Sequence, residues 1–227
     1  MRNIQELTQK LLTQTAAIPA RFNIAAESGE VCRLLKVIYK QTVAGRNFNF
    51  EENGEINLII AKVSEWLVNP KKKIGLMLYG KPGNGKTTLA TAICEMIDKL
   101  FWSPYSNGDV YDHIENKLIE RRKYVVKKTA GNIVEIAVGN LEDYTQKIRN
   151  SELLFIDEIG TESIIYKEYG SKIIIDLLQY RYSRQLFTIV TSNLSDTDFL
   201  EFYMERVNDR ITEMFDRISF NNKSFRK

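Results

Sequence analysis

Apolar positions follow two kinds of spacing along most of the chain. In some stretches apolar residues recur three and four positions apart, which is the spacing of a helix with one buried face. This spacing predicts helices over residues 4–16, 31–39, 56–67, 89–100 and 173–181. In other stretches short runs are mostly apolar, as in buried strands, and these runs occupy residues 74–79, 133–138, 153–156, 186–190 and 218–220. Strands and helices alternate in the later part of the chain, which predicts an α/β fold.

The sequence divides into two parts of unequal size. Residues 1–70 contain three of the predicted helices and end at Asn69-Pro70, a helix stop signal. We therefore assign residues 1–70 to a small helical N-terminal segment and residues 71–227 to the α/β core. The run Lys71-Lys72-Lys73 precedes the first strand of the core. For this run we favour a solvated strand entrance over a contact with a phosphate backbone.

The strongest chemical signal follows the first strand of the core. The segment Gly80-Lys81-Pro82-Gly83-Asn84-Gly85-Lys86-Thr87 matches G-x-x-x-x-G-K-[ST], and a helix is predicted to begin inside it. Glycines let the backbone approach phosphates closely, and the N–H groups at a helix start attract anions. Lys86 should reach the β- and γ-phosphates, and the Thr87 hydroxyl should bind Mg²⁺. The segment, together with Thr88, is the predicted binding site for ATP and Mg²⁺.

A second signal lies where the strand at residues 153–156 ends in Asp157 and Glu158. Four apolar residues followed by two acids fit the Walker B pattern. Asp157 would then hold the Mg²⁺ shell, and Glu158 would orient or deprotonate the attacking water. The common alternative is a strand that ends in a charged turn. We favour the functional interpretation because both acids would lie at the carboxyl edge of a parallel sheet, where ligands bind.

Composition limits the kinds of protein that this chain can be. Its 44% apolar and 27% charged content is typical of a globular protein, and no apolar run approaches the ~18 residues of a membrane span. The N-terminus lacks the apolar stretch of a signal peptide, so we expect a cytoplasmic protein with no membrane partner. Cys32 and Cys94 lie among apolar residues of predicted helices, which favours buried, reduced thiols. His113 is the single histidine, so a zinc site is nearly excluded.

Residues 101–131 give no clear periodicity. Basic residues there interleave with an aromatic one, namely Arg121, Arg122, Lys123, Tyr124, Lys127 and Lys128. This composition suits single-stranded nucleic acid, but an exposed charged helix or hairpin explains it equally well. The net charge of +3 permits a nucleic-acid partner without demonstrating one.

Taken in order, the motifs resemble those of one family. The segments GKPGNGKTT, LLFIDEIGTE, RYSRQLFTIVTSNLS, ERVNDRITEM and FNNKSFR are similar to AAA+ ATPases of the DnaC type. These are the bacterial replicative helicase loaders and their relatives, which include the IstB-like transposition helper ATPases. The resemblance runs from about Lys71 to the last residue. P-loop and Walker B motifs are shared by very many ATPases, whereas TSNLS followed by ER-x-x-DR and F-x-x-K-S-[FY]-R is much more specific.

The resemblance implies a P-loop NTPase (AAA+) fold with a five-stranded parallel sheet flanked by helices. In that fold the strand before Asn193 lies between the P-loop and Walker B strands, and Asn193 is the sensor 1 residue. The catalytic set would then include Lys86, Glu158 and Asn193.

The resemblance also implies self-association. By position, Arg210 matches an arginine finger that enters the nucleotide site of a neighbouring subunit, and Arg206 is its companion at the nucleotide. A finger that acts in trans implies assembly into a ring or spiral. The alternative for Arg210 is an intramolecular salt bridge with Glu205 or Asp209.

Two features depart from the family pattern. Residues 194–227 are too few for the full C-terminal lid that carries sensor 2 in most AAA+ proteins, so no sensor 2 arginine is assigned. Between the strand at residues 133–138 and the Walker B strand there is room for about one helix. The longer two-helix insertion with which initiators and loaders touch DNA is therefore expected to be absent or reduced. Any binding of single-stranded DNA would then fall to residues 119–128.

These observations support two classes of function. The first is an ATP-hydrolysing factor of DNA replication, similar to a helicase loader, with a replicative helicase as a partner. An IstB-like transposition helper is a variant of it within the same family. The second class is a nucleotide-dependent binding module with little turnover. A metabolic kinase is disfavoured because no lid-like arginine cluster follows the P-loop.

Overall fold

The computed structural model describes residues 21–48, 50, 52–100, 110–112, 117–119, 124–195, 198–199 and 205–221. The helix predicted at residues 4–16, the basic residues 121–123 and most of the FNNKSFR segment lie outside these ranges. Within them, no helix is both long and apolar enough to cross a membrane.

From residue 75 onwards, helices separate the strands β1, β4, β5, β6 and β7 from one another, as predicted. The helices are α2 (Ser28–Ala44), α3 (Gly54–Val68), α4 (Lys86–Leu100), α5 (Ala130–Gly139), α6 (Leu141–Asp143), the π-helical turn η1 (Tyr144–Arg149), α7 (Glu162–Ser183) and α9 (Glu205–Met214). The strands are β1 (Gly75–Gly80), β2 (Val110–Asp112), β3 (Lys117–Ile119), β4 (Val125–Thr129), β5 (Leu153–Ile159), β6 (Phe187–Ser192) and β7 (Phe215–Phe220).

Five of the strands form one sheet in the order β4-β5-β6-β1-β7, and every neighbouring pair is parallel. The predicted α/β fold with a five-stranded parallel sheet is therefore confirmed. Strand β6 lies between β1 and β5, as the resemblance implied. Because all five strands are parallel, the P-loop and the Walker B acids meet at one edge of the sheet. Strands β2 and β3 pair with each other in antiparallel orientation.

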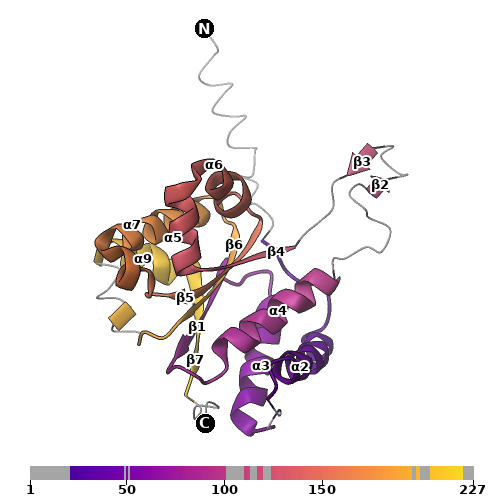
Figure 1. The fold of residues 1–227 in the computed structure, drawn as a ribbon. Helices are drawn as coiled ribbons and strands as arrows, with labels where there is room; N and C mark the ends of the chain where they lie inside the picture. Colours follow the sequence, from indigo (N-terminus) through magenta and orange to yellow (C-terminus); the bar gives the residue numbers. More distant parts are fainter. Residues whose placement is uncertain are drawn as a thin grey trace, which may run out of the picture.

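The sheet lies between two layers of helices (Figure 1). Helices α2, α3 and α4 cover one face, and α5, α7 and α9 cover the other. Successive strand residues enter opposite cores: Leu76 and Leu78 pack with the first layer, and Met77 packs with the second. Burial on both faces explains why inner strands such as β1 are largely apolar in the sequence.

The prediction of a strand at residues 133–138 is wrong, because these residues belong to helix α5. The Thr129 side chain accepts a hydrogen bond from the backbone N–H of Asn132 and caps the helix. Ile133 and Val134 are fully buried, whereas Val138 is 58% exposed. The apolar run is therefore one buried helix face with an exposed apolar residue beside it.

The strand that was expected there is β4, at the edge of the sheet. Only Val125 of its five residues is buried, so the pattern of an inner strand is missing from the sequence. This shift leaves residues 130–152 for α5, α6 and η1. The expectation of a single helix before the Walker B strand is therefore also wrong.

The prediction of a solvated strand entrance at residues 71–73 does not hold for the middle lysine. The Lys72 side chain is only 3% exposed. Its Nζ donates to the carbonyl of Leu67 at 2.9 Å and lies 4.9 Å from the centroid of the Trp66 ring. Burial lowers the pKa of Lys72 to about 8. The middle lysine thus fixes the end of α3 against the core, a role that neither sequence interpretation included.

Helices α2 and α3 of the N-terminal segment share one hydrophobic core with α4 and the sheet. Cys32 in α2 and Cys94 in α4 are both free thiols, as predicted. Cys94 is buried, which raises the pKa of its thiol, whereas Cys32 is partly exposed. The segment therefore packs against the face of the sheet that carries the P-loop helix.

Candidate active site

The P-loop follows β1 and wraps around the start of α4. Gly80, Gly83 and Gly85 have φ values of 137°, 81° and 97°, which side chains with a Cβ rarely adopt. A Cβ on Gly80 would lie 2.3 Å from the carbonyl oxygen of Phe220. The Asn84 Nδ2 donates to that same oxygen at 2.7 Å. The loop is thus fixed against the last residue of β7, which the motif alone does not reveal.

Lys86 occupies the centre of the loop. Its side chain is 4% exposed, and its Nζ donates to the carbonyl oxygens of Gly80 at 2.7 Å and Lys81 at 2.8 Å, and to Asn84 Oδ1 at 3.1 Å. The loop therefore holds a positive charge beside the first turn of α4, whose N–H groups have no acceptor within the helix. A buried ammonium and a helix N-terminus together favour a bound phosphate.

The Walker B acid meets the P-loop directly. Thr87 Oγ1, at the start of α4, donates to Asp157 Oδ1 in β5 at 2.8 Å. Both side chains offer hard oxygen ligands, the kind that Mg²⁺ prefers. Octahedral Mg²⁺ with ligands at about 2.1 Å places neighbouring ligand oxygens roughly 3 Å apart. The pair therefore fits a magnesium site that is completed by phosphate and water.

Thr191 connects the Walker B acids to strand β6, a role that the sequence interpretation missed. Its hydroxyl donates to Asp157 Oδ1 and accepts from the backbone N–H of Glu158 at 2.9 Å. The pairing of β5 with β6 is irregular between Ile156 and Ile159, and Glu158 has a φ of 58°. Thr191 is 1% exposed. The signal for it was present, since a hydroxyl residue follows Ile189 and Val190 near the carboxyl end of the strand.

A cavity of about 770 Å³ joins these residues. One wall is the P-loop from Pro82 to Thr88, together with Glu158, Thr191 and Asn193. The predicted site residues Glu158 and Asn193 therefore lie at the same cavity as Lys86, and both side chains are exposed at its surface.

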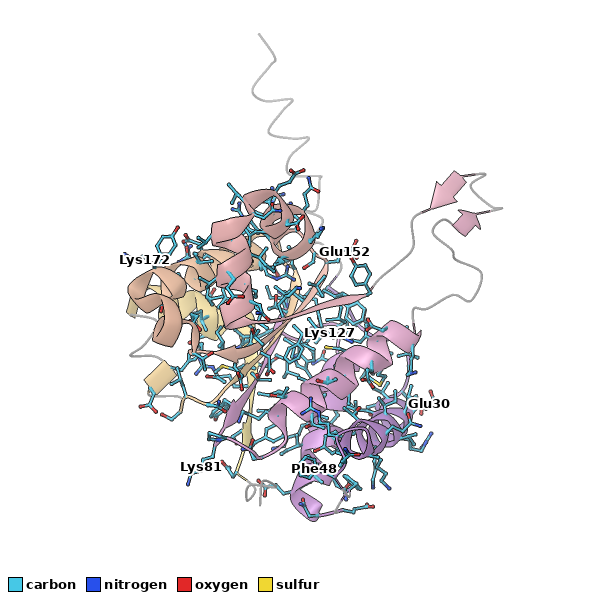
Figure 2. All side chains as sticks on the ribbon, in the orientation of Figure 1. Glu30, Phe48, Lys81, Lys127, Glu152 and Lys172 are labelled. Atoms are coloured by element: carbon cyan, nitrogen blue, oxygen red, sulfur yellow. The ribbon has the colours of Figure 1, made fainter. Side chains whose placement is uncertain are left out.

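The opposite wall comes from the N-terminal segment, which the sequence interpretation did not include in the site. It is formed by residues of α2, the turn after it and the start of α3, namely Tyr39, Val43, Arg46, Asn47, Phe48, Phe50 and Ile56. In Figure 2, Phe48 and Lys81 lie at the same end of the molecule, and Glu152, just before β5, lies toward the opposite end. The sequence signal was an arginine and two aromatic residues in the polar loop at residues 45–54.

Arg210 lies away from this cavity. It is exposed in α9 and lines a different hollow of about 530 Å³, together with residues of α5, η1 and α7. The structure therefore does not bring Arg210 to the P-loop of its own chain. Arg206 lies in the same helix, but its side chain, like those of Glu205 and Asp209, is outside the described part of the structure. Among the residues that the structure describes, no cluster of three metal-binding side chains occurs.

Comparison with known proteins places this arrangement in a family. The sequence pattern of the ATPase family associated with various cellular activities (AAA) matches residues 76–196, which contain the P-loop, both Walker B acids and Asn193. The replicative helicase loader DnaC of Buchnera aphidicola subsp. Baizongia pistaciae (strain Bp) is 30% identical over 193 residues, which are 80% of this chain and 68% of that protein. The chain belongs to the DnaC-type AAA ATPases.

Solved structures of DnaC-type and related proteins share the fold. The crystal structure of the DnaC helicase loader has a TM-score of 0.58 and 20% identity, and the match covers 76% of this chain and 93% of that one. A replication initiator DnaA bound to AMPPCP and single-stranded DNA has a TM-score of 0.52 and 17% identity, and covers 77% of this chain and 49% of that one. The recognised resemblance is thereby confirmed, whereas the roles of the individual site residues remain predictions.

Proposed function

We propose that this chain binds ATP with Mg²⁺ in the cavity between the P-loop and the N-terminal segment, and hydrolyses it. The observation that carries the proposal is the contact of Thr87 with Asp157, with Glu158 and Asn193 on the same cavity. A P-loop site that binds ATP without hydrolysing it does not need a carboxylate and an amide beside the γ-phosphate. The apolar residues Val43 and Phe48 in the wall from the N-terminal segment suit a purine base, and the fold relative DnaA was solved with AMPPCP.

Each residue has a role that follows from its position. Lys86 and the first-turn N–H groups of α4 bind the phosphates, and Thr87 and Asp157 hold Mg²⁺, which would offset phosphate charge as the bond to the leaving group lengthens. Glu158 orients a water molecule and accepts its proton. The Asn193 amide contacts that water or the γ-phosphate. Thr191 keeps Asp157 and Glu158 in place.

Arg210 is the proposed arginine finger for a neighbouring copy. Its exposure on a surface away from its own cavity supports this role, because a residue that acts in trans must reach another molecule. Arg206 on the same helix is the proposed companion. Self-association into a ring or spiral then follows, since each finger completes the site of the next copy.

The test is ATP turnover by wild type, Glu158→Gln and Arg210→Ala. Each variant alone should lose at least about 100-fold in turnover. An equal mixture of the two variants should regain activity, because Glu158→Gln supplies Arg210 to the intact site of the Arg210→Ala copy. Full turnover in Glu158→Gln would overturn the Walker B assignment. Normal turnover in Arg210→Ala, or no recovery on mixing, would overturn the trans finger.

The cellular role that we propose is that of a helicase-loader-like factor in DNA replication. Support comes from the relationship to a replicative helicase loader and from a site suited to switching between nucleotide states. A replicative helicase is the expected partner, and single-stranded DNA is a further one. Co-purification of the chain with the replicative helicase, stronger with ATP than with ADP, would support this role. Co-purification with a transposase instead would favour an IstB-like helper.

A further inference from the structure

The turn after α2 holds Arg46 in a defined position. The backbone N–H of Arg46 donates to the carbonyl of Val43 at 3.1 Å, and that of Asn47 donates to Ala44 at 2.9 Å. Helix α2 packs on α4 in the shared core, and Thr42 Oγ1 donates to Glu95 Oε2 of α4 at 3.3 Å. The turn is therefore anchored both to its own helix and to the helix that begins with the P-loop lysine.

Arg46 reaches across the cavity to the start of the P-loop helix. Its Nη1 donates to Thr88 Oγ1 at 2.9 Å, and both residues line the cavity. Thr88 lies in the first turn of α4, where the N–H groups of a P-loop cradle the α- and β-phosphates. Among the described residues Arg46 forms no ion pair. A guanidinium has five donors in a planar fork, so contact with Thr88 leaves donors for a phosphate.

We propose that Arg46 binds the α-phosphate of the nucleotide in cis, and thereby couples the N-terminal helical segment to the occupancy of the P-loop. This inference rests on the proposed nucleotide site and adds a ligand from outside the α/β core. The α-phosphate is favoured over the γ-phosphate because Thr88 follows Lys86 and Thr87 into α4, away from Glu158 and Asn193. The α-phosphate is common to ATP, ADP and AMP, so Arg46 would report whether the site is filled and not whether ATP has been hydrolysed.

Calorimetric titration of ATP and ADP tests the phosphate contact. Arg46→Ala should bind both nucleotides roughly tenfold more weakly, the effect of losing about one charge-assisted hydrogen bond. Arg46→Lys should recover part of the affinity, because it restores the charge without the planar fork. The matched control is Arg33→Ala, which removes an exposed arginine from α2 away from the cavity, and it should bind as wild type does.

The outcomes separate this inference from the proposed function. If wild type binds nucleotide and Arg46→Ala binds it equally well, the inference is wrong and the nucleotide site stands. If the loss affects ATP but not ADP, the contact is to the γ-phosphate and the α-phosphate assignment is wrong. Absence of nucleotide binding by wild type would overturn both.

Hydrogen exchange tests the coupling to the N-terminal segment. In wild type, ADP should slow exchange at the P-loop and also in the last turns of α2 and the turn at residues 45–48. In Arg46→Ala at saturating ADP, protection of the P-loop should persist and that of the α2 turn should be lost. Equal protection of both regions in the variant would show that Arg46 does not carry the coupling.

Discussion

Lys86 and Arg181 are both buried cations that donate to neutral oxygens, yet they lie at opposite edges of the same sheet. Lys86 is held by loop oxygens beside the carboxyl ends of the strands. Arg181, in α7, is fully buried and donates to the carbonyls of Phe187 at 2.7 Å and Ser151 at 2.8 Å, and to Thr188 Oγ1 at 2.9 Å. Phe187 begins β6 and Ser151 precedes β5, so Arg181 joins the amino ends of the strands.

The difference between the two regions lies in what surrounds the charge. Arg181 is enclosed by the protein, and burial lowers its pKa to about 9, so it remains cationic at neutral pH. Lys86 lines a cavity of about 770 Å³ that a ligand can enter. A buried cation is therefore structural where the chain itself fills its surroundings, and a candidate for binding where it faces a cavity at the carboxyl edge.

Replacing Arg181 should have the largest effect on stability. Arg181→Met leaves several buried carbonyl groups without their donor, and we expect a loss of about 4 kcal/mol in the free energy of unfolding. The melting temperature would fall by roughly 10 °C. Urea denaturation provides the measurement, with Arg184→Met, an exposed arginine just beyond α7, as the control. A loss below about 1 kcal/mol would mean that the Arg181 cluster does not stabilise the sheet.

Replacing Lys86 should have the opposite effect, with a large loss of ATP turnover and little change in stability. Lys86→Ala should lower ATP turnover at least about 100-fold and change the free energy of unfolding by no more than about 1 kcal/mol. The control is Lys99→Ala, an exposed lysine at the end of the same helix, which should leave turnover intact. If Lys86→Ala unfolds as readily as Arg181→Met, the distinction between a binding and a structural cation fails.

Two threonines of β6 repeat the comparison within one strand. Thr191→Val removes the hydroxyl that positions Asp157 and Glu158, and should lower kcat roughly tenfold with little change in nucleotide affinity. Thr188→Val removes the acceptor of Arg181 at the other end of the strand, and should cost about 1–2 kcal/mol of stability without affecting kcat. Thr191→Ser should retain most of the turnover. Equal kcat in wild type and Thr191→Val would remove Thr191 from the site.

Replacing Lys72 should give an effect that is visible as a pH dependence of stability. Its pKa is lowered from 10.5 to about 8 by burial, so between these pH values the unfolded chain binds more protons than the folded chain. Stability contributed by this group should therefore rise as the pH increases from 8 to 10. Urea denaturation of wild type and Lys72→Met across this range should show the gain in wild type only. The exposed Lys71→Met is the control, and parallel pH profiles for all three would contradict the prediction.

The parts of the fold that were predicted correctly depend on contiguous residues. Inner strands β1, β5 and β6 are buried on both faces, so each is a largely apolar run with polar residues toward its carboxyl end. The edge strand β4 is buried at one residue only and was missed, while α5 was mistaken for a strand because its apolar residues are adjacent. Periodicity over so short a segment does not separate the two structures.

The sequence by itself determined the P-loop motif, the two acids near the end of β5 and the family, because each depends on neighbouring residues. Tertiary structure alone decided the second wall of the cavity and the fate of the buried cations. Arg46 reaches Thr88 only because α2 packs along α4, and Arg181 is structural because the carbonyl groups of Ser151 and Phe187 surround it. Lys72 is structural because the fold buries it against Trp66 and the carbonyl of Leu67. The sequence around a charged residue does not identify its partners when these come from elsewhere in the chain. Burial and hydrogen bonding arise only from contacts in the folded protein.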